Sequence, residues 1–213
     1  MEQNVSMKIN ELPSPTWNWL KVNETPIKWS NKIEPCEIAA EGDAVSTETE
    51  QLSDIETGAG READAIFATE NTAKYQILAD NAGQDKTVRL HISGKKDAHM
   101  AGSVEIVVKE NSTLTVVMDS VAPDATKEED STAEASLAVR VRMKVESGAS
   151  VRLIQVQMPQ EHETLLSDIG GDLIGEGAKV EYIQLFLGKG NLYSGCRMDL
   201  NGKESNFATE TGY

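Results

Sequence analysis

The stretch Arg142–Gln157, RMKVESGASVRLIQVQ, contains the pattern that decides the fold. An apolar strand ends at a four-residue corner, ESGA at residues 146–149, and a second apolar strand follows it. The same plan recurs at Ile106–Asp119, at Leu173–Phe186 and, more faintly, at Leu200–Thr209. A strand–corner–strand unit that returns along a chain is typical of repeat architectures.

The four units align on the first apolar residue after each corner. This alignment places Leu114, Val151, Val180 and Phe207 in one column, at steps of 37, 29 and 27 residues. Coils stacked in parallel repeat such a unit in register, because each corner must lie on the corner below it, whereas the hairpins of a β-sandwich have no such constraint. The sequence therefore predicts an all-β fold whose units are successive coils of one solenoid.

Apolar and polar residues first alternate within each unit, which indicates a strand with one buried face. The alternation then breaks at the same place in three units, where two apolar residues are adjacent: Val116-Val117, Leu153-Ile154 and Tyr182-Ile183. A shared break predicts a bend or bulge, after which Val156 and Leu185 would face inward. Gln155 and Gln184 share the neighbouring column and would stack as an amide ladder between coils.

The composition is that of a soluble globular protein, with 39% apolar and 26% charged residues among 213. A formal net charge of −15 argues against nucleic acid and anionic membrane surfaces as partners, since both attract Lys and Arg. The N-terminus lacks the basic and apolar regions of a signal peptide, and no apolar run has the length of a membrane span. We expect a cytoplasmic protein without a disulfide framework, since Cys36 and Cys196 are its two cysteines.

Three regions differ in composition. Residues 1–36 are expected to form an N-terminal arm with a short helix that carries Trp17 and Leu20 on one face. This arm holds all three tryptophans and would dock either on the body of the protein or on a partner. Residues 37–64 carry nine carboxylates and one base, Arg61, and are expected to form a mobile acidic loop or linker. Residues 65–213 would form the β-helix core.

Strands are expected throughout the core, with Gly, Asn and Ser at the corners between them. The expected strands are Lys74–Leu78, Thr87–Ser93, Ser103–Val108, Thr113–Asp119, Leu137–Glu146, Ser150–Gln157, Lys179–Phe186 and Leu192–Leu200. An acidic insertion at Pro123–Glu134 lengthens the first step of the repeat and is expected in a surface loop.

Cys196, in YSGCRMDL, is a weak candidate for contact with a metal, because a guanidinium beside it, that of Arg197, would lower the pKa of the thiol. The alternative role of Cys196 is small core filler. Cys36 lies in a polar region and offers less. The histidines are His91, His99 and His162, and none has the i, i+4 partner of a helical zinc site.

The segment Asp168–Asp172, DIGGD, places two carboxylates four residues apart around paired glycines. A carboxylate pair suits acid–base chemistry, but two aspartates around Gly-Gly are more simply the residues of a turn. His99 is expected in a turn as a structural or surface residue. We therefore expect no catalytic residue, no metal site and no cofactor bound by this chain.

Five segments, in this order, resemble the SufB/SufD family of the SUF iron–sulfur cluster assembly system. They are LPSPTWNWLKVNE, LHISGKKDAHMAGSVEIVVKENSTLTVVMD, VRLIQVQ, LSDIGGDLIGEGAKVEYIQLFLG and YSGCRMDLNGKESNF. The resemblance covers most of residues 11–213 and is closer to SufD-like members. It implies a right-handed parallel β-helix and a cytoplasmic, non-enzymatic scaffold that pairs with a SufB-type partner and a SufC-type ATPase. An iron–sulfur cluster would be present transiently in the full complex.

Members of this family continue through further coils into a C-terminal helical segment. The resemblance therefore equates residues 1–213 with the N-terminal part of a SufD-like protein. It also implies that the ATPase contact lies in the C-terminal part, so no family site residue is carried onto this chain. A last coil without a cap would expose strand edges and favour association into a homo-oligomer.

Two other interpretations stay open. A β-helical carbohydrate-active or carbohydrate-binding protein would need clustered carboxylates and aromatic platforms along one face. The coils contain few rings, among them Tyr75, Tyr182 and Tyr193, which weighs against it. A purely structural solenoid is the third interpretation.

Overall fold

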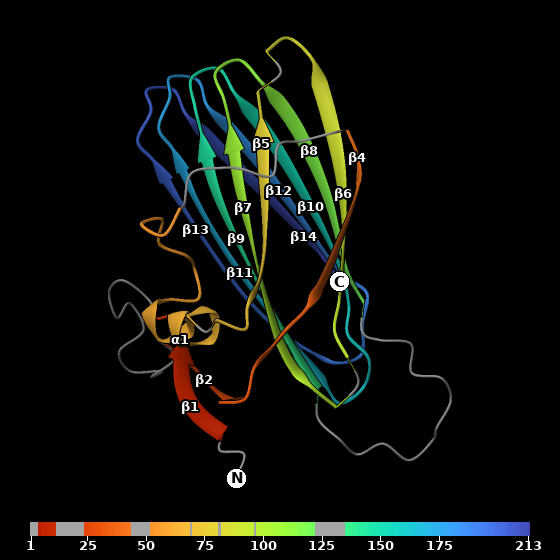
Figure 1. The fold of residues 1–213 in the computed structure, drawn as a ribbon. Coiled ribbons are helices and arrows are strands. Elements are labelled where there is room, and N and C mark those ends of the chain that lie inside the picture. The colour runs from red at the N-terminus through yellow and green to blue at the C-terminus, as the bar shows by residue number, and fades with distance from the viewer. Residues whose placement is uncertain are drawn as a thin grey trace.

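The computed structural model describes residues 4–11, 24–43, 52–68, 70–80, 82–95, 97–121 and 135–213, and strands dominate it (Figure 1). The N-terminal part contains β1 (Asn4–Ile9), β2 (Thr25–Ser30), β3 (Glu34–Pro35), β4 (Glu37–Gly42), a 3₁₀ turn (Arg61–Ala63) and α1 (Asp64–Phe67). Ten longer strands follow: β5 (Ala73–Ala79), β6 (Asp85–Ser93), β7 (His99–Val108), β8 (Thr113–Val121), β9 (Ala135–Val145), β10 (Ser150–Met158), β11 (Glu163–Leu173), β12 (Lys179–Phe186), β13 (Asn191–Leu200) and β14 (Asn206–Gly212). Within these ranges, no helix has the length and apolar character needed to cross a membrane.

The chain winds back and forth between two sheets. Sheet I contains β3, β5, β7, β9, β11 and β13, and sheet II contains β4, β6, β8, β10, β12 and β14. Among β5 to β14 all pairing is parallel. Val151 lies opposite Leu114 on one side and opposite Val180 on the other, and Val180 lies opposite Phe207. The predicted column is confirmed, and the fold is a parallel β-solenoid of about 4 turns. The handedness of its coil stays a prediction.

The corners that lead from sheet I to sheet II lie one above another. Each has a residue with φ between 56° and 79°, and these residues are Gly83, Asn111, Gly148, Gly177 and Glu204. Backbone hydrogen bonds link successive corners, as from Gly148 N–H to the Glu176 carbonyl at 2.8 Å. Since Gly and Asn tolerate this left-handed conformation best, the stacked turn explains why the sequence places them there.

The core between the two sheets is filled by Val, Ile, Leu and Met side chains. The predicted bulge is wrong, because β10 and β12 pair in unbroken register, and buried residues alternate with partly or fully exposed ones across the place of the expected bulge. Ile154 and Val156 consequently face outward, and Gln155 faces inward. The break in the apolar pattern marks an outer face that is itself apolar, not a bend in the strand.

A cluster of buried amides and hydroxyls interrupts the apolar core. The Oε1 of Gln155 accepts hydrogen bonds from Tyr182 Oη at 2.7 Å and Ser167 Oγ at 2.9 Å, and Gln184 Nε2 donates to Gln157 Oε1 at 2.9 Å. Gln155 and Gln184 share a column as predicted, but the hydrogen bonds differ from the predicted ladder. Hydroxyl groups of β11 and β12 provide the hydrogen bonds of Gln155, because a buried polar atom needs a partner even where the residue in the next coil does not supply one.

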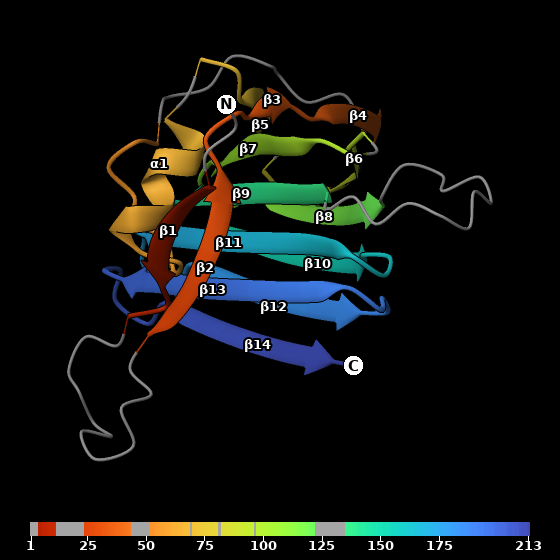
Figure 2. The ribbon, with the colours of Figure 1, turned by 90° about the horizontal axis from the view of Figure 1, so that it is seen from below.

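A layer from the N-terminal part packs on the outer face of sheet I (Figure 2). We call it the N-terminal cover; it consists of the antiparallel hairpin β1–β2 and residues 52–68. Its apolar side chains meet the outward-facing column Ala101, Ala138 and Leu166 in a second hydrophobic cluster. Trp29 is 2% exposed there, so the described part of the arm docks on the body. The expected helix with Trp17 and Leu20 lies outside the described residues.

The expected loop over residues 37–64 differs from the structure in two places. Glu37–Gly42 form β4, which pairs antiparallel with β6, and residues 52–64 belong to the N-terminal cover. The carboxylates of Glu37 and Glu41 are exposed while the backbone between them pairs, so an acidic composition here marks an edge strand. The acidic insertion at 123–134 lies outside the described residues.

Candidate functional site

Cys196 lies on β13 at the rim of the solenoid. It is in register with Ile169 of β11, which belongs to the core, so its side chain faces the inner side of sheet I. The residue is exposed, yet desolvation by surrounding atoms and then the charge of Asp168 raise the pKa of its thiol to about 11. The expectation that Arg197 lowers this pKa is wrong, because Arg197 is directed to the outer face, where it pairs with Glu56.

Cys36 lies at the opposite end of the solenoid, between β3 and β4. It is buried against β7, and its backbone N–H donates to the carbonyl of Ala101 at 3.1 Å. Burial raises the pKa of its thiol to about 12. Both cysteines are free, and both hold their thiols in the neutral form at physiological pH.

The DIGGD segment is not a corner. Asp168, Gly170 and Gly171 lie within β11, a strand absent from the sequence prediction, and all three are buried. Paired glycines normally mark a turn, but here Gly171 gives room on the inner side to the sulfur of Met198. On the outer side, Gly170 gives room to the backbone of the N-terminal cover. The glycines therefore reflect close packing on both sides of one strand.

Asp168 is the centre of a buried charge network on the outer face of sheet I. Its carboxylate accepts hydrogen bonds from Thr57 Oγ1 at 2.7 Å and from the Ala59 N–H at 2.8 Å. It also pairs with Arg140, whose Nε lies 2.8 Å from Asp168 Oδ2. The Arg140 side chain is 3% exposed, reaches Asp64 at 2.7 Å and lies 4.0 Å from the ring centroid of Phe67. One ion pair of the solenoid thus holds both ends of the 57–67 segment.

Three glycines allow the backbone of the cover to lie in direct contact with the backbone of the strands. A Cβ added at Gly170 would lie 2.4 Å from the Glu56 carbonyl oxygen, and one at Gly195 would lie 2.4 Å from the Ala59 nitrogen. In the cover itself, a Cβ on Gly58 would lie 2.0 Å from the backbone nitrogen of Cys196. No other residue fits at these positions without displacing a backbone.

A groove of about 930 Å³ lies where the cover meets β13, and Cys196 lines it together with Arg142, Arg197 and Glu56. The Arg197 guanidinium pairs with the Glu56 carboxylate, and Arg142 Nε donates to the Ile55 carbonyl at 3.1 Å. Burial, followed by the charge of Arg140, lowers the pKa of Arg142. Both guanidinium groups thus hold the cover in place, whereas the Cys196 side chain is directed to the inner side of the sheet. This arrangement joins the cover to the strands of sheet I.

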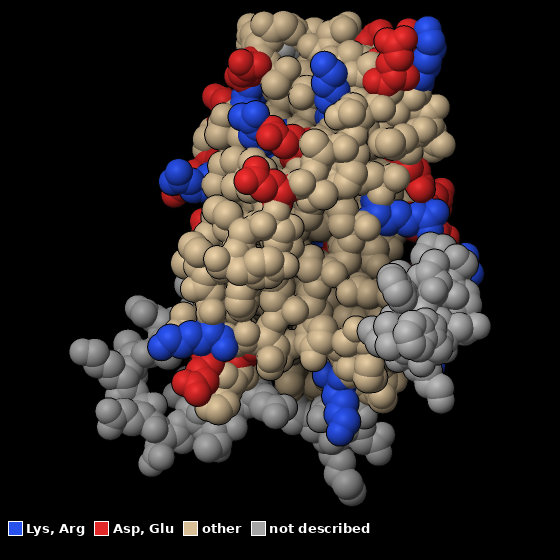
Figure 3. Space-filling view, turned by 180° about the vertical axis from the view of Figure 1, so that it is seen from behind, with Lys and Arg blue, Asp and Glu red and all other residues tan. Residues whose placement is uncertain are grey.

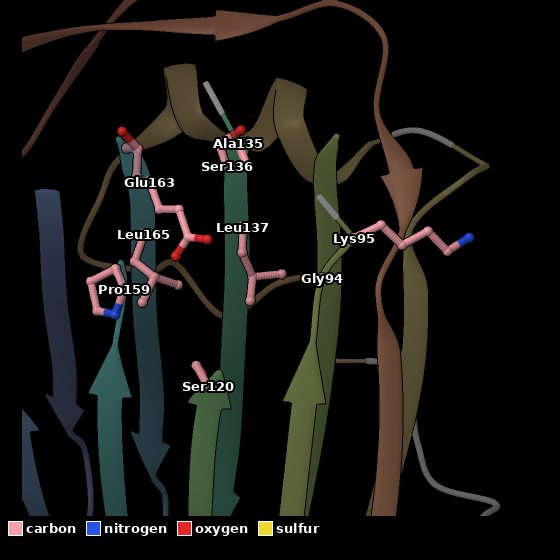
Figure 4. A pocket seen from close by; sticks show the side chains of 10 residues that line it. Gly94, Lys95, Ser120, Ala135, Ser136, Leu137, Pro159, Glu163 and Leu165 are labelled. Carbon is pink, nitrogen blue, oxygen red and sulfur yellow. The ribbon is translucent and has the colours of Figure 1, made fainter. Parts of the chain in front are cut away.

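A second cavity, of about 20 Å³, opens beside the starts of β9 and β11 (Figure 4). Leu137, Leu165 and Glu163 line it, and burial raises the pKa of Glu163. His99 begins β7 rather than lying in the expected turn, and its Nδ1 is hydrogen-bonded to Ser136 Oγ at 2.6 Å. Ser136 lines this cavity, which holds about one water molecule.

Sequence reasoning missed the Arg140–Asp168 pair, which is the most buried charge pair of the described residues. A signal was present, because the two residues are 28 positions apart, close to one coil of the repeat, and carry opposite charges. No cluster of three or more His, Cys, Asp or Glu side chains able to hold a metal occurs in the described ranges.

A comparison with known protein families matches the strands from β6 onward. A family profile described as SUF system FeS cluster assembly, SufBD core domain, matches residues 90–213, which is more than half of the chain and runs from within β6 to beyond β14. Searches of curated proteins and of solved structures give no match. The matched segment is the stacked part of the solenoid, and on this evidence the chain belongs to the SufB/SufD family of the SUF system of iron–sulfur cluster assembly.

Proposed function

We propose that this chain is a SufD-type scaffold subunit that works in the cytoplasm with a SufB-type subunit and a SufC-type ATPase. The observation that carries the proposal is the coincidence of the family match with the stacked coils, residues 90–213. In this role the solenoid supplies a rigid surface on which the partners are held. The iron–sulfur cluster is the cargo of the complex and is not a resident group of this chain.

The chemistry of the two thiols favours a scaffold role over a chain that binds an iron–sulfur cluster without a partner. Iron–sulfur clusters are held mainly by Cys thiolates, usually four of them. This chain has two cysteines, and their thiol pKa values of about 12 for Cys36 and about 11 for Cys196 disfavour the thiolate. A partner that contributes further ligands would have to complete any cluster site, with Cys196, at the rim, as the available thiol.

The carbohydrate interpretation has less support than before. Tyr182 is 2% exposed and its hydroxyl is bound to Gln155 inside the core, so its ring is no platform for a sugar. Tyr75 packs against the same core. The family match favours assembly instead.

Co-expression tests the proposal. Tagged residues 1–213 are produced with the SufB-type subunit, with the SufC-type ATPase, or with both, and the eluted complexes are quantified. We expect the SufB-type subunit to co-purify in the first and third cases. The ATPase should follow only in the third, since its contact with this chain is proposed to lie in the family's C-terminal segment.

Anaerobic reconstitution with iron and sulfide provides the second arm. A chain that forms a stable cluster alone, with visible absorption that Cys196→Ser removes, would contradict the scaffold role. Failure to retain a SufB-type subunit under any condition would leave a purely structural solenoid as the better description.

A further inference from the structure

The outer face of sheet II carries an apolar surface. Alternation along β8, β10 and β12 directs six apolar side chains outward: Val117, Ile154, Val156, Met158, Ile183 and Leu185. All six are partly exposed. The strands of this sheet lie behind those of sheet I in Figure 1, and Figure 3 views the molecule from that side, where uncharged side chains occupy a broad central area. Contiguous apolar surface of this kind marks an interaction site more often than chance exposure does.

Charged residues border this surface in a specific order. The strand register gives one row across five strands, Arg89, Val117, Ile154, Ile183 and Glu210. The row begins with a cation and ends with an anion, with three β-branched residues between them. Arg89 and Glu210 are both exposed. Glu41 of β4 continues the row beyond Arg89.

The row from Arg89 to Glu210 is complementary in charge to the same row of a second copy. A twofold axis that runs along β10, between two stacked copies of the sheet, places Ile154 against the second copy's Ile154 and Val117 against its Ile183. The same operation places Arg89 against Glu210 at both ends of the row. Isologous contacts require this reciprocity, and sheets stack face to face with their strands nearly aligned.

The neighbouring rows permit the same arrangement. On one side, Val156 would face its counterpart, and the flanking Asp119 is already paired with His91 of its own copy. On the other side, Arg152 lies on the axis but is neutralised by Glu181 of its own copy at 2.5 Å. Neither row therefore brings an uncompensated charge to the centre of the contact.

We propose that the outer face of sheet II is the interface of a homodimer, in which two copies of this chain stack face to face about an axis along β10. Strand spacing and rise give this face roughly 25 Å by 20 Å, which is at the small end of specific interfaces and predicts a dimer in the micromolar range. Each copy has a net charge of −15, so the dimer tightens as added salt screens the repulsion between copies.

Sedimentation equilibrium of the 213-residue chain tests the dimer, at concentrations from about 1 to 500 µM, which bracket the expected affinity. Ile154→Glu places two carboxylates together at the axis, and we expect it to weaken association by about 100-fold or more. Val5→Glu is the matched control, because Val5 is 48% exposed on β1, on the other side of the molecule, and this variant should dimerise as the wild type does.

Charge reversal tests the order of the row. Arg89→Glu and Glu210→Arg should each weaken the dimer by about tenfold, since each change reverses two symmetric contacts. The double variant should recover most of the affinity. These positions are exposed, so both variants fold even if Ile154→Glu does not, and unfolding curves by circular dichroism verify this.

A chain that stays monomeric over the whole range would overturn the proposal, as would a double variant that remains as weak as the single ones. A monomeric chain whose Ile154→Glu variant loses binding to a SufB-type subunit would assign this face to that partner instead. That result would leave the proposed function intact.

Discussion

The two outer faces of the solenoid have the same backbone and opposite surroundings. The outer face of sheet I carries small residues, among them Ala101, Ala138, Gly170 and Gly195, and the N-terminal cover lies directly on it. The outer face of sheet II carries branched apolar side chains such as Ile154 and Ile183, and no described segment packs over them. The small residues on the outer face of sheet I thus allow the N-terminal cover to pack on it, whereas the larger side chains on the outer face of sheet II stay accessible.

The difference also concerns charge. Under the cover, Arg140 and Asp168 are 2% and 0% exposed and make their contacts with one another and with the 57–67 segment. On sheet II the exposed ion pair Arg152–Glu181 and the hydrogen bond between His91 and Asp119 join neighbouring strands. Exposed pairs contribute at most about 1 kcal/mol, whereas loss of one member of a buried pair costs several times more. The faces should therefore respond very differently to matched substitutions.

Asp168→Ala should have the largest effect. It leaves the Arg140 guanidinium without its buried carboxylate partner and removes the acceptor of Thr57 and Ala59, so we expect a loss of about 3–5 kcal/mol in the free energy of unfolding. Urea denaturation followed by circular dichroism measures it. The matched change on sheet II, Glu181→Ala, should cost less than about 1 kcal/mol.

The double variant Arg140→Met/Asp168→Leu distinguishes the cost of an unpaired buried charge from the cost of lost packing contacts. Apolar groups of similar size fill the same space, so the double variant should be clearly more stable than Asp168→Ala. If the single and double variants lose equal stability, the charge is not what the pair contributes, and the contrast between the faces would rest on packing alone.

Leu166→Ala and Ile183→Ala compare the faces by packing. Leu166 is 0% exposed beneath the cover, so its truncation leaves a cavity and should cost about 2–4 kcal/mol. Ile183 is partly exposed, and its truncation should cost under about 1 kcal/mol in the monomer. Thermal unfolding at low protein concentration, where any dimer is dissociated, provides the measurement; equal shifts in Tm would mean that sheet II is covered as well.

The sequence was sufficient to predict the stacked coils and their register, because the column of Leu114, Val151 and Val180 repeats one buried pattern. It was not sufficient for the outer faces. Adjacent apolar residues such as Leu153 and Ile154 suggested a bulge, since periodicity alone cannot distinguish a bend from a strand that is apolar on both sides. Gly170 and Gly171 suggested a turn, because a glycine required by a neighbouring backbone looks the same in sequence as one required by φ. Thr57 and Ala59, which donate hydrogen bonds to Asp168, lie more than a hundred positions away, which no local pattern reports.

Gly195→Ala and Gly212→Ala test whether glycine is needed on both faces. The new methyl group at residue 195 would meet the Ala59 backbone nitrogen at 2.4 Å, which forces the cover to shift and should cost about 1–3 kcal/mol. At residue 212, on sheet II, it would meet only the end of the Leu185 side chain at 3.1 Å, which can move. Hydrogen exchange should rise at residues 55–60 in the first variant and stay unchanged in the second. Unchanged exchange in both would show that the cover is held without close backbone approach.

The smallest expected effect is on the reactivity of the Cys196 thiol, whose pKa is raised first by burial and then by the charge of Asp168. Its pKa is raised from 9.0 to about 11, so at a given pH below 9 about 100-fold less thiolate is present than in a thiol of ordinary pKa. Alkylation by iodoacetamide, measured by mass spectrometry, should be correspondingly slow at pH 7.5 and should rise about tenfold per pH unit up to pH 11. Cys36, whose thiol pKa is about 12, should react more slowly still.

Asp168→Asn removes the negative charge that helps to raise the Cys196 pKa, so it should speed the reaction while leaving the pH slope unchanged. An Asp168→Asn variant that reacts at the wild-type rate would mean that the Asp168 charge does not act on this thiol, and the contrast in charge between the two faces would lose this support.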